Sequence, residues 1–539
     1  MNRYAERWTD EEVARYRELG VWTDKVLSDY LDDAVEARPD SLCVADPDKQ
    51  YTFAEARDRS VRLASGLAGL GVGRGDHVAV QLPNWADAVV TYHAIARLGA
   101  VFVPRMLIYR EHEVRDAIDR AGCKVFITAD NFRKFDYAEM AMDLKKSCPS
   151  LEQVVVIGDV PDGAVAWESL LDNPPYEGPK PDPSDPHIVL FTSGTTAQPK
   201  AVLHTWNTYQ GSAHGLVQAF RLTPDDICLM SSPIMHNTGL LAGVVAPLLA
   251  KAATVIQPVW EVHEGLSLIS RFGCTFSVGA TPFVTMMIDA HDPEEYDLSR
   301  FRLFASGGAP VPGVVVRKAV EVLGCKMQTV FGQSESSLQT ITDLDDPVER
   351  VASSDGKAGK GVSMAILDED GTEVSSGEEG EICSRGPGVM LGYLDSPEEN
   401  RLAFEHGYFH SGDLGRMDAD GYIRVTGRKK DLIIRGGTNI APAEVEDLIM
   451  EHPSVASVSV VGMPDRVLGE RMCAFVVPVD GAELELDDIT NFLRSKKIAI
   501  QKLPERLELR TELPTNATGK VEKFKLREEI NRMLQSEQE

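Results

Sequence analysis

The feature that most constrains the fold is an alternation, from about residue 25 to 175, of amphipathic helical segments with short runs of β-branched residues. The runs HVAVQLPN at 77–84 and KVFITAD at 124–130 are typical of buried strands, and residues 51–71 combine a strand end with a helix. Strands that alternate with helices build parallel sheets whose faces the helices cover. We therefore predict an α/β fold.

The rest of the chain divides into further regions. A proline-rich stretch at 174–186 indicates a surface linker, and a second α/β region follows at about 187–345. Short strands with Gly and Asp turns predict a small β-rich subdomain at about 355–427, and the last hundred residues return to mixed α and β segments. With 539 residues, the chain is long enough for two to four domains or subdomains.

Charge and hydropathy exclude several classes of protein. The formal net charge is −28, from 83 acidic and 55 basic residues, which argues against general affinity for nucleic acid or an anionic membrane. The N-terminus is charged without an apolar core, so we expect no secretory signal and a cytoplasmic protein. The longest apolar stretch, 239–250, falls short of the roughly 20 residues that span a bilayer, and we predict a buried helix there instead.

The eight cysteines lie far apart and form no C-x-x-C pair. Their spacing therefore signals neither a disulfide framework nor a zinc site. We expect buried free thiols.

A hydroxyl-rich loop, FTSGTTAQPK at 191–200, has the composition of a phosphate-binding segment but departs from the Walker A pattern. Its backbone N–H groups and the hydroxyls of Thr192, Ser193, Thr195 and Thr196 can wrap a polyphosphate, with Lys200 as the cation. Taken alone, the loop is also compatible with an ordinary surface turn.

Five further motifs follow in order: SGGAP at 306–310, FGQSE at 331–335, HSGD at 410–413, GRKKDLIIRGGTNIAPAEVE at 427–446 and PTNATGK at 514–520. Together with the loop they resemble the ordered motif set of the adenylate-forming superfamily, which comprises acyl-CoA synthetases, peptide-synthetase adenylation domains and luciferases. The resemblance extends from about residue 30 to 530. It implies a large N-terminal domain with two α/β sheets and the β-rich subdomain, residues 1–429, and a small mobile α+β domain, residues 430–539, with the hinge at Lys430.

The resemblance implies that ATP and a carboxylic acid first form a mixed anhydride, the acyl-adenylate, which a thiol then attacks. Cations must offset the repulsion between the carboxylate and the α-phosphate. Lys520 would bridge the two, with Glu335 holding Mg²⁺ and His236 as a further catalytic group. The residues implied for ATP and AMP are Thr192, Ser193, Gly194, Thr195, Thr196 and Lys200 for the β- and γ-phosphates; Gly307, Gly308, Ala309 and Pro310 for the adenine slot; Phe331 and Gly332 beside the base; Ser334 for the α-phosphate; and Asp413 and Arg428 for the ribose.

The same resemblance implies a second arrangement for the thiol step. Rotation about Lys430 would withdraw Lys520 and bring Arg435, Gly436 and Gly437 to the adenylate. Residues 521–539 are too few for a carrier domain, so we expect a separate acceptor, with free coenzyme A favoured. The sequence leaves the oligomeric state open, a homodimer included.

The acyl pocket implied by the resemblance contains His236, Asn237, Gly279, Ser306, Gly307 and Gln333. The His-Asn pair is similar to that of 2,3-dihydroxybenzoate-AMP ligases, but Ala242 replaces the serine that those enzymes carry six residues past the histidine. The stretches HNTGLLAGVVAPLL at 236–249, FSVGATPF at 276–283 and FGQSE at 331–335 look closer to cyclohexanecarboxylate-CoA ligases and to actinobacterial fatty or steroid-ring acid ligases. We therefore predict a cyclic, aromatic or medium-sized apolar acid.

Two alternatives remain at this stage. One is an aryl-acid AMP ligase that loads a separate carrier protein. The other is an inactive nucleotide-binding protein, suggested by Ala197 and Ala201, which stand where relatives have glycine. If those positions require a left-handed backbone, alanine costs about 1–2 kcal/mol at each.

Overall fold

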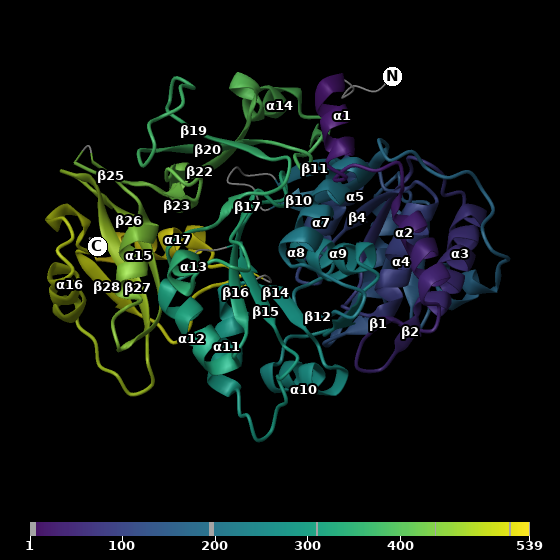
Figure 1. The fold of residues 1–539 in the computed structure, drawn as a ribbon, viewed down its shortest axis with the longest axis horizontal. Coiled ribbons are helices and arrows are strands. Elements are labelled where there is room, and N and C mark those ends of the chain that lie inside the picture. The colour runs from purple at the N-terminus through teal and green to yellow at the C-terminus, as the bar shows by residue number, and fades with distance from the viewer. Residues whose placement is uncertain (1–6, 193–198, 309–310, 437, 517–518, 538–539) are drawn as a thin grey trace.

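The computed structural model describes residues 7–192, 199–308, 311–436, 438–516 and 519–537. Two large sheets, a small sheet and a C-terminal α+β domain make up the molecule (Figure 1). The small sheet, in green, lies at the top of that view and the C-terminal domain, in yellow, at its left. The predicted fold class is confirmed.

The first large sheet has eight strands, in the order β21-β11-β10-β4-β3-β5-β8-β9. Their bounds are β3 His77–Gln81, β4 Val101–Pro104, β5 Val125–Ala129, β8 Gln153–Ile157, β9 Val165–Ala166, β10 Pro186–Thr192, β11 Lys200–Thr205 and β21 Gly392–Tyr393. The core of this sheet is parallel, and the predicted strands at 77–84 and 124–130 are confirmed as β3 and β5.

The second large sheet has nine strands, in the order β18-β17-β16-β15-β14-β12-β13-β1-β2. Their bounds are β1 Leu42–Ala45, β2 Gln50–Thr52, β12 Ile227–Met230, β13 Ala253–Ile256, β14 Phe276–Gly279, β15 Leu303–Gly307, β16 Lys326–Phe331, β17 Thr340–Ile341 and β18 Lys357–Ala358. In this order, the neighbouring strands from β16 through β15, β14, β12 and β13 to β1 are parallel.

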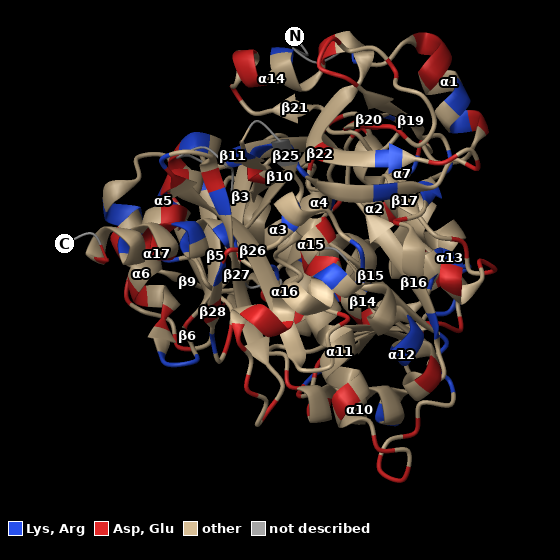
Figure 2. Ribbon diagram, turned by 90° about the vertical axis from the view of Figure 1, so that its left-hand side faces the viewer, with Lys and Arg blue, Asp and Glu red and all other residues tan. Residues whose placement is uncertain are grey.

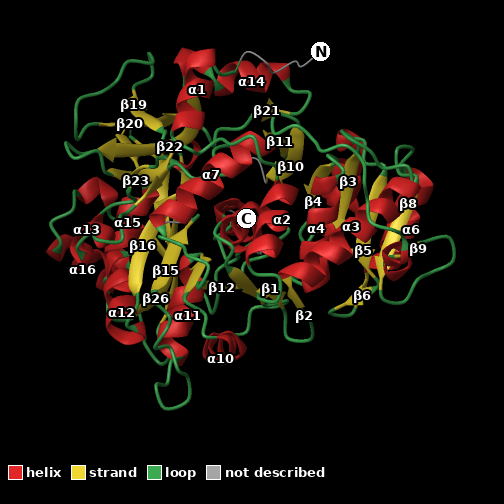
Figure 3. Cartoon of the chain, turned by 45° about the vertical axis from the view of Figure 1, so that its right-hand side comes forward, coloured by secondary structure: helices red, strands yellow, loops and turns green. Residues whose placement is uncertain are grey.

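Helices fill the space between the two sheets and cover their outer faces (Figure 3). The inner layer contains α2 Leu27–Ala37, α3 Phe53–Gly69, α4 Ala86–Arg97, α7 Trp206–Ala219, α8 Asn237–Leu240 and α9 Ala246–Leu249, with a π-helical turn at Leu241–Val245. The outer helices are α5 Glu111–Ala121 and α6 Tyr137–Ser147 on the first sheet, and α10 Val262–Phe272, α11 Thr281–Ala290, α12 Gly313–Leu323 and α13 Val348–Ser353 on the second.

Strand β3 shows why the strands appear in the sequence as runs of apolar residues. Val78 and Val80 face the inner layer, whereas Ala79 faces the outer helices, and all three are fully buried. A strand covered on both faces loses the alternation of polar and apolar residues that marks a half-exposed strand.

The two α/β regions exchange strands, which the sequence analysis did not anticipate. Strands β1 and β2 of the first region join the nine-stranded sheet, whereas β10 and β11 of the second region join the eight-stranded sheet.

The stretch at 355–427 is also less uniform than predicted. Its short strands β18 and β21 complete the two large sheets, and it contains helix α14, Pro397–Ala403.

The small sheet has the order β19-β20-β22-β23, with bounds β19 Ser363–Leu367, β20 Glu379–Arg385, β22 Phe409–Met417 and β23 Ile423–Arg428. The C-terminal domain combines β24 Ile433–Arg435, β25 Thr438–Ile440, β26 Val455–Asp465, β27 Gly469–Pro478 and β28 Arg506–Leu509 with α15 Pro442–Ile449, α16 Leu486–Ser495 and α17 Lys523–Ser536. Outside these units lie α1 Asp10–Glu18 and the two-stranded pair β6 Asn131–Phe132 and β7 Phe135–Asp136.

All eight cysteines are free and buried, as predicted. The apolar stretch at 239–250 is confirmed as buried helix. Within the described ranges, no helix is both long enough and apolar enough for a bilayer crossing. On the face drawn in Figure 2, basic and acidic residues are interspersed over helices and loops.

Candidate active site

A cavity of about 770 Å³ lies between the large domain and the C-terminal domain. Strands from both large sheets end at it: β10 at Thr192, β14 at Gly279 and β15 at Gly307. Ligands of open α/β sheets bind at the carboxyl ends of the strands, where the connecting loops diverge. The topology therefore marks this cavity as the candidate active site.

Most of the residues singled out from the sequence line this one cavity. They are Thr192, Lys200, His236, Asn237, Gly279, Gly307, Gly308, Gly332, Gln333, Ser334, Glu335, Asp413, Arg428, Lys430 and Lys520. Ser193, Gly194, Thr195, Thr196, Ala197, Ala309, Pro310 and Gly437 lie outside the described residues.

Four expected residues are described but lie elsewhere than the cavity wall. Phe331 packs against the core of the small sheet, and Ser306 is fully buried with no hydrogen-bond partner for its Oγ among the described residues. Arg435 forms an ion pair with Glu505 inside the C-terminal domain, Nε to Oε1 2.7 Å, and Gly436 is exposed. In this pose the cavity is thus lined by Lys520, whereas Arg435 and Gly436, the described residues expected to serve the thiol step, lie outside its wall.

The two glycines that end β15 are required by the backbone. A Cβ at Gly307 would lie 2.2 Å from the carbonyl oxygen of Val330 on the neighbouring strand. Gly308 has φ +80°, in the left-handed region that L-residues avoid. Gly307 is thus required by close contact with the neighbouring strand, and Gly308 by its backbone conformation.

Ala201 does not need the glycine that relatives carry. It lies in β11, paired with Phe191, and is absent from the positive-φ residues. The condition for backbone strain is therefore not met at this position, because the residue is in an ordinary strand.

A compact set of charges faces the cavity from the small sheet and the C-terminal domain. Asp413 on β22 pairs with Arg428 on β23, Oδ1 to Nε 2.8 Å, because the two residues are register partners. Burial raises the pKa of Asp413, and the cations of Arg428 and Lys520 oppose that rise. Burial and the Arg428 cation lower the pKa of Lys520 to about 8.

This shift predicts a pH dependence. The folded pKa of Lys520 lies below its usual value, so the ammonium is present below about pH 8 and is lost as the pH rises through it. We expect kcat/KM for acid-dependent ATP–pyrophosphate exchange to fall above about pH 8, by about tenfold per pH unit. The test is a pH profile of wild type beside Lys520→Arg, whose guanidinium stays charged. A limb that is unchanged in Lys520→Arg would contradict the assignment.

Glu335 forms a second polar group with a tyrosine that the sequence analysis missed. Its Oε1 accepts a hydrogen bond of 3.0 Å from the hydroxyl of Tyr393, and Lys200 Nζ lies 3.5 Å from the same hydroxyl. Burial raises the pKa of Glu335, opposed by Tyr393 and Lys200. Tyr393 reaches the site because β21 pairs with β11, a contact between segments almost 200 residues apart that no local pattern reveals.

His236 and Asn237 begin helix α8 beside an apolar part of the cavity. Burial, with a contribution from Lys520, lowers the pKa of His236 to about 4, so the imidazole is neutral at pH 7. Asn237 Nδ2 donates to Ser337 Oγ at 3.3 Å, while its buried Oδ1 has no partner among the described residues. Apolar residues that line the cavity include Leu216, Met235, Leu241, Ala242, Val278 and Leu338.

The cavity joins apolar side chains to the buried carboxylate of Glu335, two strand-end glycines and five basic side chains of described residues, and so suits an anionic ligand with an apolar part. The basic side chains are Lys200, Arg428, Lys429, Lys430 and Lys520. Two family profiles match the chain, "AMP-binding enzyme" over residues 31–394 and "AMP-binding enzyme C-terminal domain" over residues 444–520. The chain belongs to the adenylate-forming superfamily of AMP-binding enzymes and is an adenylate-forming ligase, which uses ATP and a carboxylic acid.

Relatives of this chain include enzymes of two kinds. It is 36% identical over 534 residues to the medium-chain fatty-acid–CoA ligase of Escherichia coli (strain K12), covering 98% of this chain and 94% of that one. It is 32% identical over 530 residues to the 2,3-dihydroxybenzoate-AMP ligase of Bacillus subtilis (strain 168), covering 98% of each. Among solved structures, the anthranilate CoA ligase AuaEII in complex with anthranoyl-AMP matches with a TM-score of 0.88 at 26% identity, covering 95% of this chain and 98% of that one.

Proposed function

We propose that the chain is an AMP-forming acid–thiol ligase that joins a cyclic, aromatic or medium-sized apolar carboxylic acid to coenzyme A. The observation that carries the proposal is the continuity of the apolar wall around Ala242 with the charged region around Lys520, in one cavity. An apolar acyl group in the first region would direct its carboxylate toward the second.

In the proposed first step, a carboxylate oxygen attacks the α-phosphorus of ATP, the bond to the β-phosphate oxygen breaks, and pyrophosphate leaves. Lys520 would lower the repulsion between the reacting anions, and Lys200 would bind the departing phosphates. Asp413 would accept hydrogen bonds from the ribose hydroxyls. In the second step, the thiol sulfur would attack the acyl carbon and AMP would leave.

Mg²⁺ fits the residues around Glu335. This buried carboxylate accepts the Tyr393 hydroxyl on Oε1, and a dication at the remaining oxygen would stabilise its charged form against burial. Glu335 would thus hold the ion, which supplies charge compensation for the phosphates when bound.

The two steps require two arrangements, and we infer that residues 1–429 and 430–539 move as separate bodies about Lys430. In support, the C-terminal domain has its own apolar cores, built on β26 and β27. The contact between Arg424 and Asp447, Nη2 to Oδ2 2.6 Å, joins the two bodies through polar groups that water can replace.

A second candidate function is the loading of an aryl acid onto a carrier protein. The observation that favours it is the Oδ1 of Asn237, which has no hydrogen-bond partner within the described ranges and suits the hydroxyl of a ring-substituted acid. A screen of benzoates, cyclohexanecarboxylate and fatty acids by coenzyme A-dependent AMP release separates the two. We expect release with an apolar acid and coenzyme A. Exchange with hydroxybenzoates that yields no coenzyme A product would support carrier loading instead.

The acyl pocket can be tested by narrowing it. Ala242 is buried at the cavity wall, whereas Ala246, one helical turn later and equally buried, lies away from it. Ala242→Val should lower the ratio of kcat/KM for the preferred acid to that for butyrate by about tenfold, since one or two methyl groups in a fitted pocket discriminate to that extent. Ala246→Val should leave the ratio unchanged. An equal effect of both variants would place the acyl group elsewhere.

A further inference from the structure

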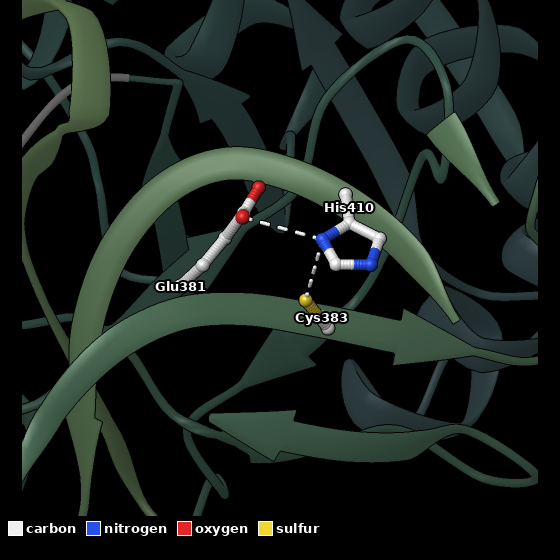
Figure 4. Close-up of side chains that lie close together, drawn as sticks. All are labelled: Glu381, Cys383 and His410. Atoms are coloured by element: carbon white, nitrogen blue, oxygen red, sulfur yellow. Dashed lines mark hydrogen bonds and ion pairs between the residues drawn. The ribbon is translucent and has the colours of Figure 1, made fainter. Parts of the chain in front are cut away.

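Three side chains on the small sheet gather at one point beside the cavity: Glu381 and Cys383 from β20 and His410 from β22 (Figure 4). Cys383 and His410 are cross-strand register partners, and an irregularity in the pairing between Glu381 and Cys383 allows the carboxylate to reach the same point. His410 Nδ1 lies 3.2 Å from Glu381 Oε2 and 3.4 Å from Cys383 Sγ.

The two separations from His410 Nδ1 match edges of a metal coordination tetrahedron. Zinc binds imidazole nitrogen and carboxylate oxygen at about 2.0 Å and thiolate sulfur at about 2.3 Å, so tetrahedral ligands lie about 3.3–3.5 Å apart. The three ligand atoms all lie within 4.8 Å of one another. An ion at their centre would therefore require small shifts of side chains that already converge.

Neighbouring groups hold two of the three ligands in the orientation that metal ligands need. His410 Nε2 is 3.1 Å from the carbonyl oxygen of Glu405, to which it donates, so Nδ1 is the nitrogen directed at the cluster. The backbone N–H of Gly412 donates to Glu381 Oε1 at 2.9 Å and leaves Oε2 on the side of the cluster. Such outer contacts fix the tautomer and direction of metal-binding side chains.

We propose that Glu381, Cys383 and His410 form a site for Zn²⁺, with one coordination position open to water. A mixed sulfur, nitrogen and oxygen set selects zinc over Mg²⁺, which prefers oxygen ligands, so the site is distinct from that of the nucleotide-bound ion. Cysteine spacing could not reveal it, because the ligands come from two strands and lie up to 29 residues apart (410 − 381).

The proposed zinc site lies close to the proposed hinge and to Asp413. Glu381 Oε2 is also 3.5 Å from Nζ of Lys429, the residue before the proposed hinge, and His410 is three residues before Asp413. A bound ion would take this carboxylate oxygen from Lys429. Zinc is thus expected to alter the catalytic rate by acting at the hinge while leaving the acyl pocket unchanged.

In the test, the full chain is freed of metal, placed in excess Mg²⁺ and titrated with Zn²⁺ in competition with a chromophoric chelator. We expect one ion per chain, with an affinity that Cys383→Ser lowers by at least about 100-fold, the upper limit of what outer-shell changes cost. Cys473→Ser is the matched control, because Cys473 is equally buried in β27 of the C-terminal domain. Its affinity should equal that of wild type.

Two further measurements distinguish loss of the metal site from loss of folding. Co²⁺ added to the wild-type chain should give the near-ultraviolet charge-transfer absorption of thiolate coordination. His410→Gln, which keeps a polar side chain of similar reach, should lower the affinity as Cys383→Ser does, with an unchanged circular dichroism spectrum. Absence of zinc binding, affinity that is insensitive to Cys383→Ser, or a Co²⁺ spectrum without the thiolate band would each overturn the proposal.

Discussion

Replacing Lys520 by alanine is expected to slow adenylate formation by about 100- to 1,000-fold, or about 2.7–4 kcal/mol, while thioester formation from a supplied acyl-adenylate stays close to wild type. The ammonium group of Lys520 enters the cavity from the C-terminal domain, beside Asp413 and Arg428. It would act where an anionic carboxylate approaches an anionic phosphate. Once the mixed anhydride exists, that repulsion is gone.

The two half-reactions separate this role from a structural one. ATP–pyrophosphate exchange measures the first, and release of AMP from synthetic acyl-adenylate with coenzyme A measures the second. Lys523→Ala is the control, because Lys523 is a neighbouring lysine whose Nζ pairs with Glu446 at 2.7 Å inside the C-terminal domain. Equal losses in both half-reactions of Lys520→Ala would mean that the lysine only supports the fold.

Elements with a strong local pattern could be predicted from the sequence. Strands β3 and β5 are β-branched runs buried on both faces, and helix α16 is amphipathic with acidic residues in its first turn. Each of these patterns lies within a short stretch of sequence, in which the spacing of apolar residues directly reflects which side chains are buried.

The order of the strands could not be predicted in the same way. Strand β1 pairs with β13, whose residues lie more than 200 positions later, and β10 leaves its own region to pair with β4. A strand that is buried on both faces carries no local mark of its neighbour.

The same distinction between local patterns and contacts of distant segments applies to the residues of the candidate site. Its glycines, Glu335, Asp413 and Lys520 lie on motifs and converge on one cavity because strand ends meet there. Tyr393 was missed because it reaches Glu335 through a strand pairing of distant segments. Phe331 was expected at the base, but it packs against the core of the small sheet, a contact with residues distant in the sequence that its own motif does not reveal.

A crosslink can lock the C-terminal domain in the observed pose. A Cβ at Gly519 would lie 3.8 Å from the Cβ of Ala280 in the large domain, close to the mean separation of about 3.8 Å in disulfides. The double variant Ala280→Cys, Gly519→Cys should therefore oxidise readily. Gly519 has φ +79°, so its replacement costs about 1–2 kcal/mol, which the reduced form of the same variant also bears. The native cysteines are buried and should not compete.

The most direct test of the two-pose account is to compare both half-reactions in the oxidised and reduced forms of this variant. We predict that the oxidised enzyme keeps the ATP–pyrophosphate exchange rate of the reduced one, because Lys520 stays in the cavity. Thioester formation from acyl-adenylate should fall by at least about 100-fold and return on reduction, because the segment at Arg435 cannot enter. An oxidised enzyme that forms thioester as fast as the reduced one would contradict the account.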